Sequence, residues 1–379
     1  QTRFSFSGTG VEANFDGQIA RADGKFALKG AARLESADLE PWLAEAGISL
    51  PGFGYGLPVT LSAELDAGDG LVVVNGLQGN VADKAVNGDL NAELRDGVPH
   101  LTGSLAIAGL DLGVAAEMVA GGSAFQSGSG IWPQQPFTES GSAPFTADVE
   151  VTADQLWLGK SITAEGAQLR LKIDPRGFAV SDFTSHLFGG TAKGLAEFRN
   201  DAGTGLLSAQ LSLNGAPIET ILPDSGLSGH SDISASVTAS GKSVEALVAA
   251  LSGSGSASLE NLTIAGIDPT AIAPLLAEAD KIGVEINAEK VGAFAPELIR
   301  RESFPAGDID LAFTVANGVV RMPPVQLKNR NTRMSVEASA DLRNRTVSTN
   351  GSVTYDPGLE AVAGAEPVVR FAYQGAIGE

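Results

Sequence analysis

The chain has 379 residues, no cysteine and a formal charge of −20, because 45 acidic residues outnumber 25 basic ones. That charge disfavours nucleic acid and anionic membrane surfaces as partners, and the lack of cysteine excludes disulfides and thiolate chemistry. Glycine contributes 47 residues and aromatic residues only 6 %, so apolar faces must be built mainly from Val, Leu, Ile and Ala between frequent turns. This composition is typical of a β meander.

The first 120 residues alternate apolar and polar side chains in short stretches, beginning with Phe4 and Phe6. Alternation with period two is the pattern of a strand with one apolar and one wet face. Asp23-Gly24 and Asp96-Gly97 supply residues that tolerate the positive φ angles of tight hairpins. We therefore expect a repetitive β module over 1–120.

A stretch rich in Gly, Ser and Pro over 121–143 predicts a linker, followed by a second β module over 144–379. Both sides of the linker alternate in the same way. The pattern leaves open whether the linker separates two domains or two segments of one sheet.

The second module contains the clearest alternation, and Pro175-Arg176-Gly177 and Asn317-Gly318 supply turn signals between its strands. Its apolar rows stay apolar along their whole length. The residues of these rows that we single out are Val149, Val151, Leu169, Leu171, Ile173, Leu211, Leu213, Ile233, Val237, Ile309, Leu311, Phe313, Val315 and Val336.

Helices are predicted to be few and short. Ser36 to Gly47, Ser243 to Leu251, Asp268 to Ile282 and Lys290 to Arg301 have helical spacing, and Asp268 is expected as N-cap with Pro269 at the first helical position. Such helices close the end of a sheet more often than they carry a site. Their number is too small to cover the apolar face of a long sheet.

The sequence contains no residue pattern that is typical of a catalytic or metal-binding site. His100, His186 and His230 lack the spacing of a metal site. The run Gly8 to Ala13 matches a dinucleotide loop, but strand-like alternation rather than a helix follows it. We expect no catalytic residue, no metal, no cofactor and no enzymatic activity.

Several short stretches follow one another in a defined order between residues 131 and 355. They are Ile131-Trp132-Pro133, Pro136-Phe137, Ala147-Asp148-Val149, Leu169-Arg170-Leu171, His186 to Gly190, Pro217 to Pro223, Gly241-Lys242-Ser243, Leu251 to Gly255, Gly266-Ile267-Asp268, Ile309 to Gly318 and Ala338 to Leu342. In order and spacing they resemble the C-terminal region of the AsmA family of Gram-negative envelope proteins, part of the AsmA/TamB superfamily of bridge-like lipid transfer proteins. Phe188 replaces the more usual Tyr, and 1–120 resembles only the repetitive middle part of such proteins.

The resemblance implies an elongated, curled antiparallel sheet that forms an open trough, with acyl chains bound along its apolar face. It also implies a non-enzymatic role in lipid transport between the inner and outer membranes or in outer-membrane biogenesis. The location implied is the periplasm, with phospholipid or another envelope lipid as partner. Because the chain begins at Gln1, we expect it to be part of a longer chain whose inner-membrane anchor lies outside it.

The residues alone support the same picture, because an alternating sheet must cover its apolar face and few helices are available to do so. A closed β-sandwich is the alternative fold. A structural scaffold that assists outer-membrane protein assembly is the alternative function. For a lipid trough, we expect a charge at Leu171 or Leu311 to impair lipid binding more than folding.

Overall fold

The computed structural model describes residues 2–22, 25–45, 54–126, 128, 130–139, 145–159, 161–329, 332–355 and 366–377. The chain divides into two compact units. The first contains 1–187, 192–211 and 238–247, and the second contains 188–191, 212–237 and 248–379.

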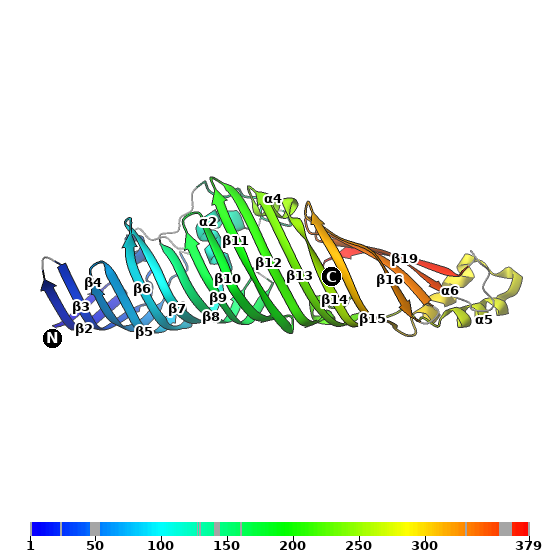
Figure 1. Cartoon of the computed structure of the whole chain (residues 1–379), viewed down its shortest axis with the longest axis horizontal. Helices are drawn as coiled ribbons and strands as arrows, with labels where there is room; N and C mark the ends of the chain where they lie inside the picture. Colours follow the sequence, from blue (N-terminus) through cyan, green and yellow to red (C-terminus); the bar gives the residue numbers. More distant parts are fainter. Residues whose placement is uncertain are drawn as a thin grey trace. The chain divides into compact units, whose positions relative to one another are not determined.

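Ten strands of the first unit follow one another in chain order (Figure 1). They are β1 (Thr2–Gly8), β2 (Val11–Ala22), β3 (Lys25–Ser36), β4 (Val59–Gly68), β5 (Leu71–Val81), β6 (Lys84–Arg95), β7 (Val98–Asp111), β8 (Thr146–Trp157), β9 (Thr163–Asp174) and β10 (Gly177–Leu187). Each pairs with the next, and every pairing is antiparallel except that of β7 with β8, which is parallel.

The second unit is built mainly from six strands, which also pair antiparallel in chain order. They are β14 (Ser252–Ile264), β15 (Phe304–Ala316), β16 (Val319–Asn329), β17 (Thr332–Asp341), β18 (Thr346–Tyr355) and β19 (Val368–Ala376). Strands β11 (Gly190–Asp201), β12 (Thr204–Pro217) and β13 (Leu227–Gly241) contribute residues to both units.

The strands belong to one 19-stranded sheet, and the sheet is open rather than closed on itself. The expected all-β fold with an open sheet is therefore confirmed, and the alternative closed sandwich is not adopted. Tight turns form where the sequence predicts them: Asp96 has φ 51° and Gly97 φ 81°, and Asn317 has φ 52° and Gly318 φ 72°. Both pairs have the positive φ angles that a two-residue hairpin turn requires. The predicted turn at 23–24 lies outside the described residues.

The helices are short, as expected, but their bounds differ from the prediction. They are α1 (Glu40–Glu45), α2 (Leu112–Ala120), η1 (Gly122–Phe125), α3 (Ile218–Ile221), α4 (Val244–Ala250), α5 (Ile272–Ile282), η2 (Gly283–Glu285) and α6 (Ala288–Ile299). The sequence prediction included neither α2 nor α3.

One predicted helix start is confirmed, and two are wrong. Ser243 caps α4 as expected, because its Oγ accepts a hydrogen bond from Ala246 N at 3.1 Å. Ser36 was the wrong start for α1, since it ends β3 and the Asp38 carboxylate instead accepts from Glu40 N at 3.0 Å. Asp268 was also the wrong cap for α5. Its carboxylate accepts from the backbone N and the hydroxyl of Thr270, both at 2.7 Å, and this local turn delays the helix.

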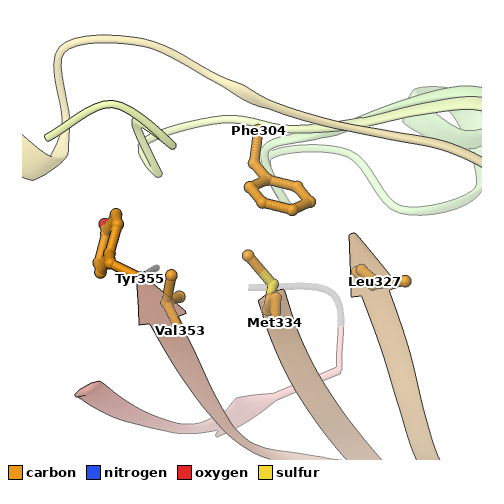
Figure 2. Close-up of a cluster of buried hydrophobic side chains, with 5 residues drawn as sticks. All are labelled: Phe304, Leu327, Met334, Val353 and Tyr355. Carbon is orange, nitrogen blue, oxygen red and sulfur yellow. The ribbon is translucent and has the colours of Figure 1, made fainter. Parts of the chain in front are cut away.

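A compact apolar core closes one end of strands β16–β18 in the second unit. Leu327, Met334 and Val353 rise from these three neighbouring strands, and Phe304 points toward them from the opposite side (Figure 2). The segment before α5 is tied to the same place, because Thr332 Oγ1 donates to the Pro269 carbonyl at 2.8 Å. Helices α5 and α6 pack on each other at this end of the unit (Figure 1). They close the end of a sheet, as the sequence predicts.

Whether 1–120 and 144–379 fold independently stays a prediction. Within the predicted linker 121–143, the structure describes 121–126, 128 and 130–139. These residues are bonded to the chain around the start of α4: Phe137 N donates to the Lys242 carbonyl at 2.8 Å, and Glu245 N donates to the Pro133 carbonyl at 3.0 Å.

Candidate apolar binding groove

One face of strands β1–β7 is apolar from the first strand to the last. Directly paired residues lie on the same face of a sheet, so the register can be followed across the strands. Phe15 pairs with Phe4 on one side and Ala32 on the other, and Leu34 pairs with Leu61. The larger apolar residues on this face are Phe4, Phe6, Phe15, Ile19, Leu28, Leu34, Leu61, Leu65, Val72, Val74, Leu77, Val86, Leu90, Leu101, Leu105 and Ile107. We call this face of β1–β7 the open groove.

The open groove is hollowed over β1–β5, where a concave region of about 450 Å³ is present. Its lining is apolar except for Asn14, Arg33 and Ser62, which the register places on the opposite face of their strands. Phe4 is 58 % exposed and Ile19 49 %, so this apolar surface lacks a complete cover from the protein itself. A concave and mostly apolar surface of this volume is typical of a small-molecule or lipid site.

Apart from residues at strand ends, such as Arg21 and Lys84, the charged side chains of these strands lie on the opposite face. Arg3 and Asp16 form an ion pair at 2.6 Å, and Lys29 and Asp66 form another at 2.9 Å. The hydrogen bond that Arg3 donates to Asp16 raises the pKa of Arg3, and the one that Lys29 donates to Asp66 raises the pKa of Lys29. The charges are thus paired on the wet face. The open groove itself therefore offers contacts to an uncharged, apolar ligand.

Helix α1 borders the groove at the end of β1. The Trp42 ring meets the Phe6 ring edge to face, with centroids 5.4 Å apart, and lies so close to Gly8 that a Cβ there would be 2.8 Å from it. Gly at this position therefore lets the indole approach the strand. The Glu40 carboxylate fixes the following loop by accepting from Gly54 N at 2.7 Å and Gly56 N at 3.1 Å.

A crossover bounds the open groove on its other side. Because β7 and β8 are parallel, the chain between them must run back along the strand direction, from the end of β7 to the start of β8. We call the described part of this connection, α2, η1 and residues 130–139, the strap. Helix α2 contacts β8 and β10 within the first unit (Figure 1) and buries Ala115, Met118, Val119 and Ala120.

Burial along the apolar face changes sharply where the strap lies. Leu101 and Leu105 of β7 are half-buried, whereas Val149 and Val151 of the adjoining β8 are 6 % and 4 % exposed. In a single sheet, such burial requires another element over the face, and α2 supplies it. The expectation that helices are too few to cover the sheet is thus wrong at this place.

Five of the sequence-predicted groove residues come together beneath the strap. Val149 pairs with Leu171, and Val151 pairs with Leu169, while Ile173 pairs with Ala147 on the same face. All are buried except Leu171, which is half-buried. Their side chains contribute to the packed part of the first unit.

The remaining predicted residues lie on later strands. In β15, Ile309, Leu311, Phe313 and Val315 form one row, opposite Leu259, Ala257, Gly255 and Gly253 of β14. Ile309 and Val336 pack against the buried core of the second unit, and the Phe313 ring lies over Gly255. Leu211 is 50 % exposed, and Leu213, Ile233 and Val237 are half-buried. The role of all these residues in binding remains a prediction.

The open groove itself was missed as a candidate site, although its signal is present in the sequence. Phe4 and Phe6 open an alternating pattern that continues through the strands up to Ile107. Helix α2 was also missed. Its signal is Asp111, whose carboxylate accepts from Gly113 N at 2.7 Å, followed by a run of small and apolar residues up to Ala120.

Within the described ranges, no group of His, Asp and Glu side chains is placed to hold a metal ion, and no helix has the length and apolar character needed to span a membrane. No curated protein and no solved structure matches the chain. The family model for the AsmA family matches residues 73–325, from within β5 to within β16. AsmA proteins are associated with the cell envelope and with lipid transport. Since the match covers more than half of the sequence, the chain belongs to the AsmA family.

Proposed function

We propose that the chain binds the acyl chains of envelope lipids in the open groove and takes part, without catalysis, in lipid transport between the inner and outer membranes. The observation that carries this proposal is the apolar face that remains accessible across β1–β7, with the charged pairs on the opposite face. A scaffold would be expected to break such a face with paired polar residues. The register contains no such pair away from the strand ends of the described groove.

The energetics of such a groove need no directional contacts. About ten methylenes laid against Leu, Val and Phe side chains would contribute roughly 8 kcal/mol before the costs of association. Immobilising the lipid removes several kcal/mol of that gain. The resulting affinity is strong enough to hold an acyl chain and weak enough to release it.

Native mass spectrometry with lipid extraction tests this proposal on the chain purified from a Gram-negative host. We expect co-purified phospholipid or another envelope lipid. A lipid-free protein that also takes up no phospholipid from vesicles would contradict it. In the second unit, Leu311→Glu extends the test to the predicted row on β15, where we expect less retained lipid and little change in stability.

The proposed location is the periplasm, with a tether to the inner membrane through a segment outside this chain. Membership of an envelope-associated family supports this location. Fractionation of cells that express the full-length protein tests it. We expect the protein in the inner-membrane fraction and the present residues accessible to protease only after the outer membrane is opened.

A further inference from the structure

The strap crosses the apolar side of the sheet between its two rims. His100 pairs with Thr146, and Asp111 pairs with Trp157, so the chain leaves β7 at one rim and enters β8 at the other. These paired segments are about 36 Å long at 3.3 Å per residue. The nine residues of α2 extend over about 13 Å of this path, and the chain returns to the end of the helix at Thr138, whose N donates to the Ala120 carbonyl at 2.9 Å.

Burial shows which side of the sheet the strap occupies. On β8, Val149, Val151 and Ala153 are buried, while the residues between them, Glu150 and Thr152, are exposed. The strap therefore lies on the face that continues the open groove. A ligand lying along that face would meet the strap at β8.

A single buried side chain is hydrogen-bonded to two separate segments of the strap, the end of α2 and the chain at Thr138. Asn200, which is 4 % exposed, donates from Nδ2 to the Val119 carbonyl at 2.9 Å and to the Thr138 carbonyl at 2.8 Å. Its Oδ1 accepts from Gly203 N at 3.0 Å, which fixes the amide orientation. Phe137 adds an apolar anchor, because it is 4 % exposed and its ring lies 5.6 Å from that of Phe198.

We propose that the strap is the stop that sets how far an acyl chain can extend along the sheet, and that Asn200 is the positioning residue that holds this stop in place. This inference rests on the proposed function. The seven strands of the open groove, about 4.8 Å apart, extend over about 29 Å, close to the ~30 Å hydrocarbon core of a bilayer. That length accommodates two lipid tails end to end, or one unusually long tail, before the strap.

Photolabelling with a fatty acid that carries a diazirine at its methyl end tests the position of the stop. After irradiation of the whole chain, labelled peptides are mapped by mass spectrometry. In the wild type we expect label in β1–β7 and only background in β8–β10. In Asn200→Ala we expect several-fold more label in β8 and β9. Asn75→Ala, which removes an exposed amide from β5, is the matched control and should keep the wild-type pattern.

The outcomes separate this inference from the proposed function. Equal labelling of β1–β7 and β8–β10 in the wild type would overturn the stop and leave lipid binding intact. No labelling above background in any strand would overturn both. Hydrogen exchange that shows a loosened strap in Asn200→Ala, together with an unchanged labelling map, would overturn the role of Asn200. The wild-type map decides the position of the stop even if that variant does not fold.

Discussion

A charge placed in the open groove should abolish binding without unfolding the protein, and Leu65→Glu is the sharpest form of this test. Leu65 lies in the hollow between Gly30 of β3 and Val74 of β5, and its side chain is half-buried. A bound acyl chain would cover this position. Losing the leucine contact alone costs about 2 kcal/mol, or roughly 30-fold in affinity. Burying the new carboxylate adds several kcal/mol more.

In the free protein the same carboxylate can remain hydrated, so we expect the free energy of unfolding to fall by about 1 kcal/mol or less. Titration with a fluorescent fatty acid measures the affinity, and denaturant unfolding measures the stability. Gln78→Glu is the matched control, because it adds the same charge to an exposed position on β5. Binding by Leu65→Glu within about threefold of the Gln78→Glu control, a difference below 0.7 kcal/mol, would refute the groove as the binding face.

Three further predictions concern stability. Phe304→Ala should lower the free energy of unfolding by about 3 to 5 kcal/mol in denaturant titrations, because Phe304 is fully buried, whereas Phe26→Ala, at an exposed ring, should change it by less than about 1 kcal/mol. The hydrogen bond from Arg343 holds the pKa of Asp341 well below its ordinary value of 3.8. The stability that this carboxylate contributes is therefore complete above about pH 5 and is lost as the pH falls below about 4, so the deficit of Asp341→Asn in unfolding experiments should shrink on acidification. For Leu171, beneath the strap, the structure replaces the expectation from the sequence: Leu171→Glu should lower the thermal midpoint more than Leu65→Glu does, because its neighbour Val149 is buried. An equal or smaller loss would contradict the packed state of this region.

The strands were predictable because their signal is local. Rows such as Ile309 to Val315 alternate strictly, and Asp96-Gly97 and Asn317-Gly318 have the residues that tight turns require. Alternation also fixes which side chains share a face, since a strand has a side-chain period of two. The open sheet and the family could therefore be predicted from the sequence.

The accessible part of the apolar face was not predictable in the same way. Val149 and Leu105 have the same pattern in the sequence, yet one is buried and the other is half-exposed. The difference comes from α2, which is brought over β8 by a parallel pairing and held by Asn200 far along the chain. Local periodicity contains no information about such a distant contact.

The parallel pairing of β7 with β8 also has a consequence for how the protein folds. Neighbours such as β6 and β7 are joined by two residues and can pair as soon as they are made. The junction of β7 and β8 must first close a connection over 112–145, which is about four doublings longer and costs about 2.5 kcal/mol more in loop entropy. During synthesis, β1–β7 can form a sheet before β8 pairs with the edge of β7. Assembly of the first unit is therefore expected to pause at this junction.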